Sequence, residues 1–397
     1  MAFTEETRLL WADFPADEYS ARVERAQGLM AAEGLDVVVL TQKENVEYFS
    51  GFLTGHWASK SFPTAAVVLH RTKAPILVIP RFFAGTAWST CWIDNIHFFE
   101  EPHAAPREFA DVLIAAVREA GGKDARIGFE RGQNLQPLWN TDDYIKVMAE
   151  LVGGGEILSA ANVVWGCRTI KSEREIERMK WLTGVTDRAI LAMFRDLHLG
   201  ETEIEVGNQL AKEMIDGGAE DTSFRNIRAG GNRYHCSDSH PQNRAFIEND
   251  LLVIDTGALF NGYVTDVAYT VLFGKPTARH EEVWDVVVRA QDAAIALCRP
   301  GVRACDVFFA SEAIIKESGL PTLDMIGHTL GLDLHEPPML TPYCTDPLKA
   351  GMILSVEPWL YDPTGLGVFA VEEHILVTED GPVNLSSIER NELRTVR

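Results

Sequence analysis

The hydrophobic and polar positions in the first part of the chain alternate between two patterns. Residues 18–33 place apolar side chains at helical spacing, and residues 35–41 form the short apolar run that is typical of a buried strand. Residues 64–70 and 74–80 predict a β-hairpin, and residues 126–130 predict another short strand before a helical stretch. This alternation predicts an α/β domain with a core of its own.

The pattern changes near residue 165. Ser172 and Glu175 form a capping box, which predicts the start of a long helix that runs to about residue 195. After it, helical patterns mix with apolar strands, which indicates an α+β arrangement. We therefore expect two domains, a smaller α/β domain at residues 1–164 and an α+β domain at residues 165–397.

One predicted hairpin of the second domain carries two aspartates among its apolar residues. In residues 251–266 the dipeptide Asn261–Gly262 predicts a two-residue turn with both residues at positive φ. This turn sets Asp255 opposite Ala268 and places Asp266 on the same face, because side chains alternate along a strand. Taken alone, the pair is also explained by an exposed hairpin. If the face is buried, the two like charges require a positive group to compensate them.

Three further segments carry polar side chains inside apolar patterns. The segment GHTLGLDLHEPP contains His328 and His335 among glycines, and Glu357 ends an apolar strand. Glu372 and Glu373 lie inside another apolar strand, so one of them must face inward. Each residue alone also has an ordinary explanation as a hydrogen-bonded core histidine or a solvated acid.

Together these segments supply four carboxylates and one imidazole, which suggests a site for two divalent ions. Hard oxygen donors with a single nitrogen suit Mn²⁺, our first choice, with Co²⁺, Fe²⁺ or Zn²⁺ as alternatives. The absence of cysteine from the set argues against a structural zinc site. A pair of metals lowers the pKa of a bound water to about 7 and supplies the positive charge that the aspartates need. The residues alone leave open which acid bridges the ions.

Composition excludes several classes of partner. The net charge of −22 disfavours binding to nucleic acid or to an anionic membrane surface. The first residues contain early acids and no long apolar stretch, so we expect neither a signal peptide nor a membrane anchor. The 6 cysteines are scattered without a CxxC spacing, which favours reduced thiols and a cytoplasmic protein.

The order of the candidate ligands resembles a known family. The contexts IDTG, GYVTD, GHTLGLDLHEPP, SVEP and LVTEDG closely resemble the pita-bread metallohydrolases, which include prolidase, aminopeptidase P and creatinase. The resemblance extends to the start of the chain and to the linker RTIKSEREIERM. It implies a C-terminal pita-bread domain preceded by a smaller creatinase-type N-terminal α/β domain.

The resemblance also implies roles for the candidate residues. Asp255 would bind one metal, Asp266 and Glu372 would bridge both, and His328 with Glu357 would complete the second site. Glu357 would also be the proton shuttle, and His335 would contact the substrate.

The sequence departs from the usual family pattern at several positions. Tyr269 stands where the peptidases usually carry arginine, and Ala370 replaces a second arginine. The position of the usual proton-shuttling histidine is Asp238, flanked by His235 and His240. We expect His240 to take over this catalytic role, and we expect Tyr269, His235 and His240 to contact substrate together with His335.

The leading functional hypothesis is cleavage of Xaa-Pro peptide bonds. The alternative keeps the metals but acts on a small non-peptide molecule, by creatinase-like C–N hydrolysis or by lyase chemistry of the kind that acts on dimethylsulfoniopropionate. A third hypothesis is a non-catalytic binding protein, which retention of all five ligands disfavours. The resemblance further implies a homodimer, and we expect a loop that exposes Trp57 and Phe62 to lie near the partner's pocket.

Overall fold

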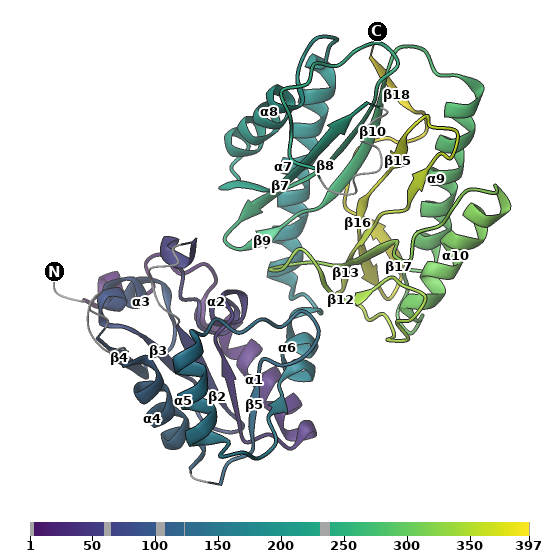
Figure 1. Ribbon diagram of the computed structural model, residues 1–397. Coiled ribbons are helices and arrows are strands. Elements are labelled where there is room, and N and C mark those ends of the chain that lie inside the picture. Colours follow the sequence, from purple (N-terminus) through teal and green to yellow (C-terminus); the bar gives the residue numbers. More distant parts are fainter. Residues whose placement is uncertain (1–3, 59–64, 101–107, 123, 231–238, 397) are drawn as a thin grey trace. The chain divides into compact units, whose positions relative to one another are not determined.

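The computed structural model describes residues 4–58, 65–100, 108–122, 124–230 and 239–396. The chain divides into two compact units, Met1–Arg168 and Thr169–Arg397 (Figure 1). The boundary expected between residues 164 and 165 falls inside helix α6 (Ala161–Arg168). Within the described ranges, no helix is both long and apolar enough to cross a membrane.

The first unit is built around a six-stranded sheet with the order β4-β3-β2-β1-β5-β6. The apolar run VVVL is fully buried and forms a central strand, antiparallel to one neighbour and parallel to the other. The predicted hairpin is confirmed by the antiparallel pairing of β2 with β3. The strands are β1 (Val37–Leu40), β2 (Ala66–His70), β3 (Ile76–Pro80), β4 (Ile96–Phe99), β5 (Ile127–Phe129) and β6 (Leu158–Ser159).

Helices complete this α/β unit. Helix α1 ends at Gly34, whose φ of 66° suits a residue without a side chain. The helices are α1 (Ala16–Glu33), α2 (Lys43–Ser50), α3 (Ala84–Thr90), α4 (Phe109–Gly121), α5 (Thr141–Leu151) and α6, with short 3-10 helices η1 (Glu5–Thr7), η2 (Gly55–Ala58) and η3 (Arg81–Phe83).

The loop that was expected to expose Trp57 and Phe62 is only partly described. The Trp57 side chain is half-buried, and its ring packs edge-on against Phe52 with 6.1 Å between ring centroids. The expectation that Trp57 is exposed is therefore wrong. Phe62 lies outside the described residues.

The second unit contains two five-stranded sheets. The first has the order β18-β10-β8-β7 with β9 paired to β8, and the second has the order β12-β11-β13-β16-β17. The first sheet contains β7 (Asp221–Ala229), β8 (Leu251–Phe260), β9 (Tyr263–Val264), β10 (Val267–Phe273) and β18 (Arg394–Val396). The second contains β11 (Gly327–Thr329), β12 (Glu336–Met339), β13 (Ile353–Val356), β16 (Glu373–Thr378) and β17 (Gly381–Asn384), and a separate pair consists of β14 (Trp359–Tyr361) and β15 (Val368–Ala370).

Two pairs of helices flank these sheets (Figure 1). Helices α7 (Glu173–Asp196) and α8 (Glu203–Asp216) pack against β7 and β8, while α9 (Ala278–Ala296) and α10 (Ala304–Glu317) pack against each other, and α9 also contacts β13 to β15. The predicted capping box at the start of α7 is confirmed, with Ser172 and Glu175 in reciprocal hydrogen bonds. The buried face of α9 meets the first sheet and the β14–β15 pair through apolar residues such as Val287, Val253 and Phe369. The unit is α+β, as predicted.

The predicted aspartate hairpin forms in the expected register. Asn261 and Gly262 have φ values of 45° and 80°, and Phe260 pairs with Tyr263. Farther along the same register, Asp255 pairs with Ala268. The two-residue turn Asn261–Gly262 thus fixes the register that places Asp255 opposite Ala268.

Candidate metal centre

Asp266 lies in a short interruption between two strands. Strand β9 ends at Val264 and β10 begins at Val267, so Thr265 and Asp266 leave the regular ladder. The Thr265 carbonyl folds over Gly257, where a Cβ would lie only 1.6 Å from the carbonyl oxygen. Only glycine permits this close approach, which accounts for the glycine that follows Asp255 in IDTG.

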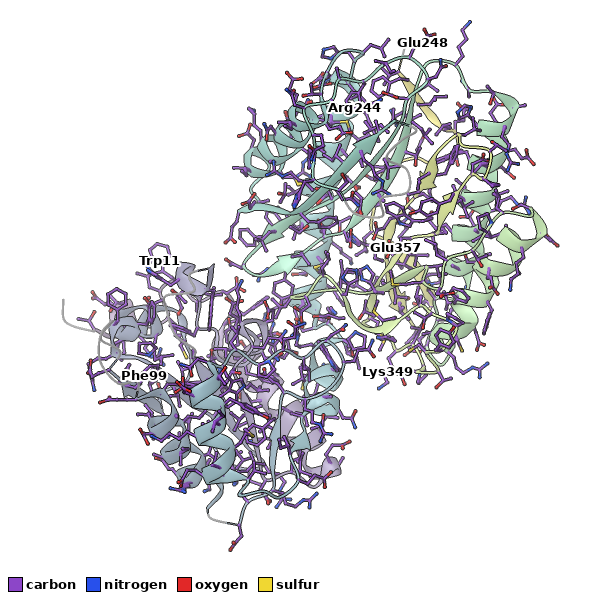
Figure 2. All side chains as sticks on the ribbon, viewed as in Figure 1. Trp11, Phe99, Arg244, Glu248, Lys349 and Glu357 are labelled. Atoms are coloured by element: carbon purple, nitrogen blue, oxygen red, sulfur yellow. The ribbon has the colours of Figure 1, made fainter. Side chains whose placement is uncertain are left out.

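The other candidate ligands come from the second sheet. His328 lies on β11 opposite Ser355 of β13, Glu357 directly follows β13, and Glu372 directly precedes β16. Figure 2 labels Glu357, whose side chain is 12% exposed. The two sheets thus bring together the carboxylates and the imidazole that the sequence singled out.

Three overlapping groups of ligand atoms form one cluster, and the atoms within each group lie within 4.8 Å of one another. The groups are Asp255, Asp266 and Glu372; His328, Glu357 and Glu372; and Asp266, His328 and His335. Two groups share Glu372 and two share Asp266, so the cluster has room for more than one ion with shared ligands.

Hydrogen bonds leave one ligand atom free on each of three side chains. Asp266 Oδ1, His328 Nε2 and Glu372 Oε2 are buried without a hydrogen-bond partner among the described residues. The other ring nitrogen of His328 lies 3.0 Å from the Thr329 carbonyl oxygen, which can only accept, so Nδ1 is the donor. In the neutral ring, Nε2 then carries a lone pair that points into the cluster. Buried polar atoms without partners are costly, and a cation would satisfy all three.

The protonation of the metal-free cluster reflects its crowding. Burial raises the pKa of Asp255 to about 7, and the Glu357 carboxylate adds to the rise. Burial and neighbouring carboxylates also raise the pKa of Asp266 and of Glu372 well above the ordinary values. Burial alone would lower the pKa of His328, but the carboxylates of Glu357 and Glu372 outweigh burial and raise it. The donor set therefore fits hard divalent cations, which would replace these protons.

Asp255 and Glu357 are held by neighbouring side chains. Asn226 on β7 donates from Nδ2 to Asp255 Oδ2 over 2.9 Å, and its Oδ1 accepts from Arg228 Nη1 over 2.8 Å. Trp359 donates from Nε1 to Glu357 Oε2 over 2.9 Å. Sequence reasoning missed all three supporting residues, although the alternation of Asn226 and Arg228 along one strand face was a signal that could have found them.

Asp266 is held by a buried histidine. The Asp266 backbone N–H donates to His374 Nε2 over 2.9 Å, while His374 Nδ1 lies 3.0 Å from the Thr183 hydroxyl. Burial and the nearby His328 lower the pKa of His374 to about 3, so its ring is neutral. His374 fixes the backbone of Asp266 and does not act as a ligand itself.

The expectation that one of Glu372 and Glu373 faces inward needs extension, because both are buried. Glu372 joins the cluster, where it accepts a hydrogen bond from Ser355. Glu373 Oε2 instead accepts from Arg390 Nε and from Asn384 Nδ2, each over 2.8 Å.

The cluster opens into a pocket of about 1290 Å³ within the second unit. The His335 ring lies 4.2 Å from the His328 ring between centroids, and burial with the nearby His328 lowers the pKa of His335 to about 4. His240 also lines the pocket. The lining also includes aromatic and acidic side chains, among them Phe224, Trp359, Tyr343, Tyr361, Asp221 and Asp324.

One of the expected substrate contacts, Tyr269, is not found in this pocket. Tyr269 is buried on β10 on the strand face opposite Ala268, and its hydroxyl lies 3.3 Å from Ser386 Oγ. The expectation that Tyr269 contacts substrate is corrected accordingly, because alternation along β10 turns its ring away from the pocket. His235 and Asp238 lie outside the described residues.

The chain matches two family models. The model of metallopeptidase family M24 matches residues 177–379, and the model of the creatinase/prolidase N-terminal domain matches residues 22–170. Among curated relatives, an Xaa-Pro dipeptidase of Pyrococcus furiosus is 27% identical over 372 residues, which cover 93% of this chain and 98% of that protein. An uncharacterised peptidase of Staphylococcus epidermidis is 31% identical over 380 residues, which cover 93% of this chain and 99% of that protein.

Solved structures show the same architecture. A dipeptidase, PepE, from Mycobacterium ulcerans matches with a TM-score of 0.83 and 23% identity, over 96% of this chain and 99% of the other. The prolidase from Pyrococcus horikoshii OT3 matches with a TM-score of 0.80 and 24% identity, over 94% of this chain and 100% of the other. These likenesses confirm the predicted fold, a creatinase-type N-terminal domain followed by a pita-bread domain.

Proposed function

The chain belongs to metallopeptidase family M24, and from this premise we propose that it uses two divalent metal ions to hydrolyse Xaa-Pro peptide bonds. It is a metallopeptidase, similar in sequence to Xaa-Pro dipeptidases. The number of metal ions, the bond that is cleaved and the roles of individual residues are the parts that we propose.

The observation that carries the proposal is the convergence of five ligand side chains with three unpartnered buried atoms. Asp255 would bind one ion, His328 and Glu357 the other, while Asp266 and Glu372 would bridge the two. Mn²⁺ is our first choice, because the set contains hard oxygen donors and one nitrogen.

Bound ions would supply a nucleophilic water at neutral pH and would polarise the peptide carbonyl. The chain's own residues would handle protons and orientation. Glu357 would carry the proton from the attacking water toward the leaving nitrogen. His335 is neutral because its pKa is lowered to about 4, so one ring nitrogen can donate a hydrogen bond to the substrate at neutral pH.

His240 would take the place of the family's usual histidine at the leaving group. It lines the pocket, and an imidazole can act as a general acid that donates a proton to the leaving nitrogen. Aromatic walls formed by Phe224, Trp359 and Tyr361 suit the apolar ring of proline.

The test is hydrolysis by protein stripped of metal with a chelator and then reloaded with Mn²⁺, Co²⁺, Fe²⁺ or Zn²⁺. Xaa-Pro dipeptides and longer Xaa-Pro peptides are compared with matched Xaa-Ala peptides. We expect metal-dependent cleavage before proline and weak cleavage before alanine. If no peptide is cleaved although metal is bound, the non-peptide alternative replaces this proposal.

A further inference from the structure

Arg228 is a fully buried cation in the wall of the metal centre. It lies on β7 with an exposed fraction of 0%. A buried guanidinium is costly unless other groups satisfy it, so its contacts indicate why it is there. Because side chains alternate along a strand, Arg228 lies on the same face as Asn226, which contacts Asp255.

The first contact of Arg228 leads to Asp255. Arg228 Nη1 donates to Asn226 Oδ1 over 2.8 Å, which turns the amide so that Nδ2 faces Asp255 Oδ2 at 2.9 Å. An amide that is free to rotate could present its oxygen to the carboxylate, and two acceptors would then face each other. Arg228 removes this alternative because it occupies the oxygen, together with the Ser239 backbone N–H, which donates to the same Oδ1 over the longer distance of 3.1 Å.

The second contact leads to Glu357. The guanidinium carbon of Arg228 lies 5.0 Å from the centroid of the Trp359 ring, within the range of a cation–π interaction. The same indole donates from Nε1 to Glu357 Oε2 over 2.9 Å. The guanidinium thus packs on the ring whose edge fixes the second carboxylate.

The two contacts reach carboxylates from different sheets. Asp255 belongs to β8 of the first five-stranded sheet, and Glu357 follows β13 of the second. We propose that Arg228 is a positioning residue that orients both carboxylates toward the metal ions, Asp255 through Asn226 and Glu357 through Trp359. This role rests on the proposed metal centre and adds to it a residue that touches neither metal nor substrate.

Arginine suits this role better than lysine. A planar guanidinium can pack on an indole while one of its edges donates a hydrogen bond, whereas an ammonium is a compact point charge. If Arg228 served only to offset negative charge, lysine would replace it. If it positions the two carboxylates, lysine would not.

The test measures Co²⁺ binding to metal-free protein, with visible absorption reporting the ligand geometry. We expect Arg228→Met to lower Co²⁺ affinity by about 10- to 100-fold, as is usual for residues that orient metal ligands. The absorption spectrum of bound Co²⁺ should also change, because two carboxylates lose their orientation. Wild-type affinity and spectrum in Arg228→Met would refute the role of Arg228 alone, while a wild-type protein that binds no Co²⁺ would refute the metal centre together with it.

The first unit offers a closely matched control. Arg168 is 1% exposed, donates from Nη1 to Asn45 Oδ1 over 2.8 Å, and has its guanidinium carbon 4.9 Å from the Trp165 ring centroid. Arg168→Met therefore removes a buried arginine with the same two kinds of contact, but from the first unit, which contributes no residue to the three ligand groups. We expect it to leave Co²⁺ affinity unchanged, and a loss equal to that in Arg228→Met would overturn the proposal.

Two further variants separate positioning from charge and from loss of folding. Arg228→Lys keeps the charge, and we expect it to lower Co²⁺ affinity; full affinity would show that charge alone suffices.

In the Asn226→Ala, Trp359→Phe background both contacts are altered, so Arg228→Met should lower Co²⁺ affinity by less than it does in the wild-type background. An undiminished additional loss would show that Arg228 acts by another route. Far-UV circular dichroism checks that each variant is folded.

Discussion

At the scale of single residues, the metal centre depends on which atom of each side chain remains free. The Thr329 carbonyl occupies His328 Nδ1, and Ser355 occupies one oxygen of Glu372, which leaves Nε2 and the other carboxylate oxygen for a metal. The same principle applies to the backbone of Asp266, which His374 holds in place. The removal of one bridging carboxylate should therefore disturb the whole cluster.

We expect Asp266→Ala to abolish both tight metal binding and peptidase activity, because the remaining carboxylates then repel one another without a shared ligand. Metal content by inductively coupled plasma mass spectrometry and hydrolysis of an Xaa-Pro peptide are the two measurements. The first unit should stay folded, which its far-UV signal would report. Full activity with two bound ions would contradict the bridging role.

The Asp255 carboxyl of the metal-free protein should contribute stability that is lost as pH rises from about 4 to about 7. The pKa of Asp255 is about 7 in the folded protein and near 3.8 when unfolded, so in this window the unfolded chain loses a proton that the folded chain keeps. The neutral rings of His335 and His374, whose pKa values are lowered to about 4 and about 3, contribute with the opposite sign. The measurement is therefore the difference in melting temperature between chelator-treated wild type and Asp255→Asn, which should shift in favour of the variant from pH 5 to pH 7.5. Added Mn²⁺ should shift it back toward the wild type, because the variant lacks a ligand. A difference that shifts in favour of the metal-free wild type over this range would contradict the assignment.

His240→Ala should lower turnover at least about tenfold, within the usual range for the loss of a general acid. Metal content should not change, because His240 lines the pocket but belongs to none of the three ligand groups. The matched variant His198→Ala, at an exposed histidine outside the pocket, serves as the control. A silent His240→Ala together with an impaired His235→Ala would reassign the role to His235.

The candidate ligands could be predicted from the sequence because burying a charged residue of an apolar strand costs free energy unless a partner compensates the charge. A charged residue in such a strand therefore indicates a partner. Asp255, Asp266 and Glu372 all gave this signal. Asn226 and Arg228 did not, since polar residues are common on an edge strand and only the fold shows that this face is buried. The prediction that Tyr269 contacts substrate was wrong because it was taken from the family's arginine position. It did not consider which face of β10 carries the side chain.

At the scale of elements, a buried ion pair holds the segment that carries His335. Lys171, just before α7, contacts Glu336 of β12 over 2.8 Å, and both side chains are 1% exposed. Gly331 permits this contact, because a Cβ there would lie 3.0 Å from Lys171 Cε. Lys171, near the start of the second unit, thus binds Glu336, the residue that follows His335.

Lys171→Met should destabilise the protein by about 3–5 kcal/mol, because it leaves the Glu336 carboxylate buried without its partner. Turnover should also fall, since the neighbouring His335 loses its support. The double variant Lys171→Met, Glu336→Gln should regain much of the stability, which denaturant unfolding would measure. Lys212→Met, which removes an exposed pair with Asp216, should have little effect. Equal losses in Lys171→Met and Lys212→Met would contradict this account.

Elements defined by local chemistry were predictable, and those defined by distant contacts were not. The turn Asn261–Gly262 set the hairpin register, and the capping box at Ser172 set the start of α7. The interruption at Thr265 and Asp266 depends on the close approach to Gly257 and left no mark in the periodicity. Short strands such as β14 and β15 depend on pairing between segments whose own patterns are weak.

At the scale of the whole molecule, the first unit presents large apolar side chains to solvent. Trp11 is 71% exposed and Phe82 is 73% exposed, and the Phe82 ring contacts the ring of His56 in the loop that was expected to approach a partner. Exposed aromatic residues are enriched at interfaces between proteins. These side chains are therefore candidates for the contact in the predicted dimer.

We expect the protein to be a homodimer in small-angle X-ray scattering at micromolar concentration. The double variant Trp11→Ser, Phe82→Ser should weaken this dimer, whereas Phe309→Ser, at an exposed aromatic residue of the second unit outside the pocket, should not. A monomer at every concentration tested would refute the predicted assembly.

The placement of the ligands on two sheets has a consequence for motion. The two ions together would link β8 and the segment before β10 to β11, to the residue after β13 and to the segment before β16. Metal binding would therefore raise the free energy that local opening of either sheet costs. Amide hydrogens in both sheets should then exchange more slowly as metal concentration rises, and they should do so together. The amount of bound metal would thereby determine how independently the two sheets of the second unit open locally.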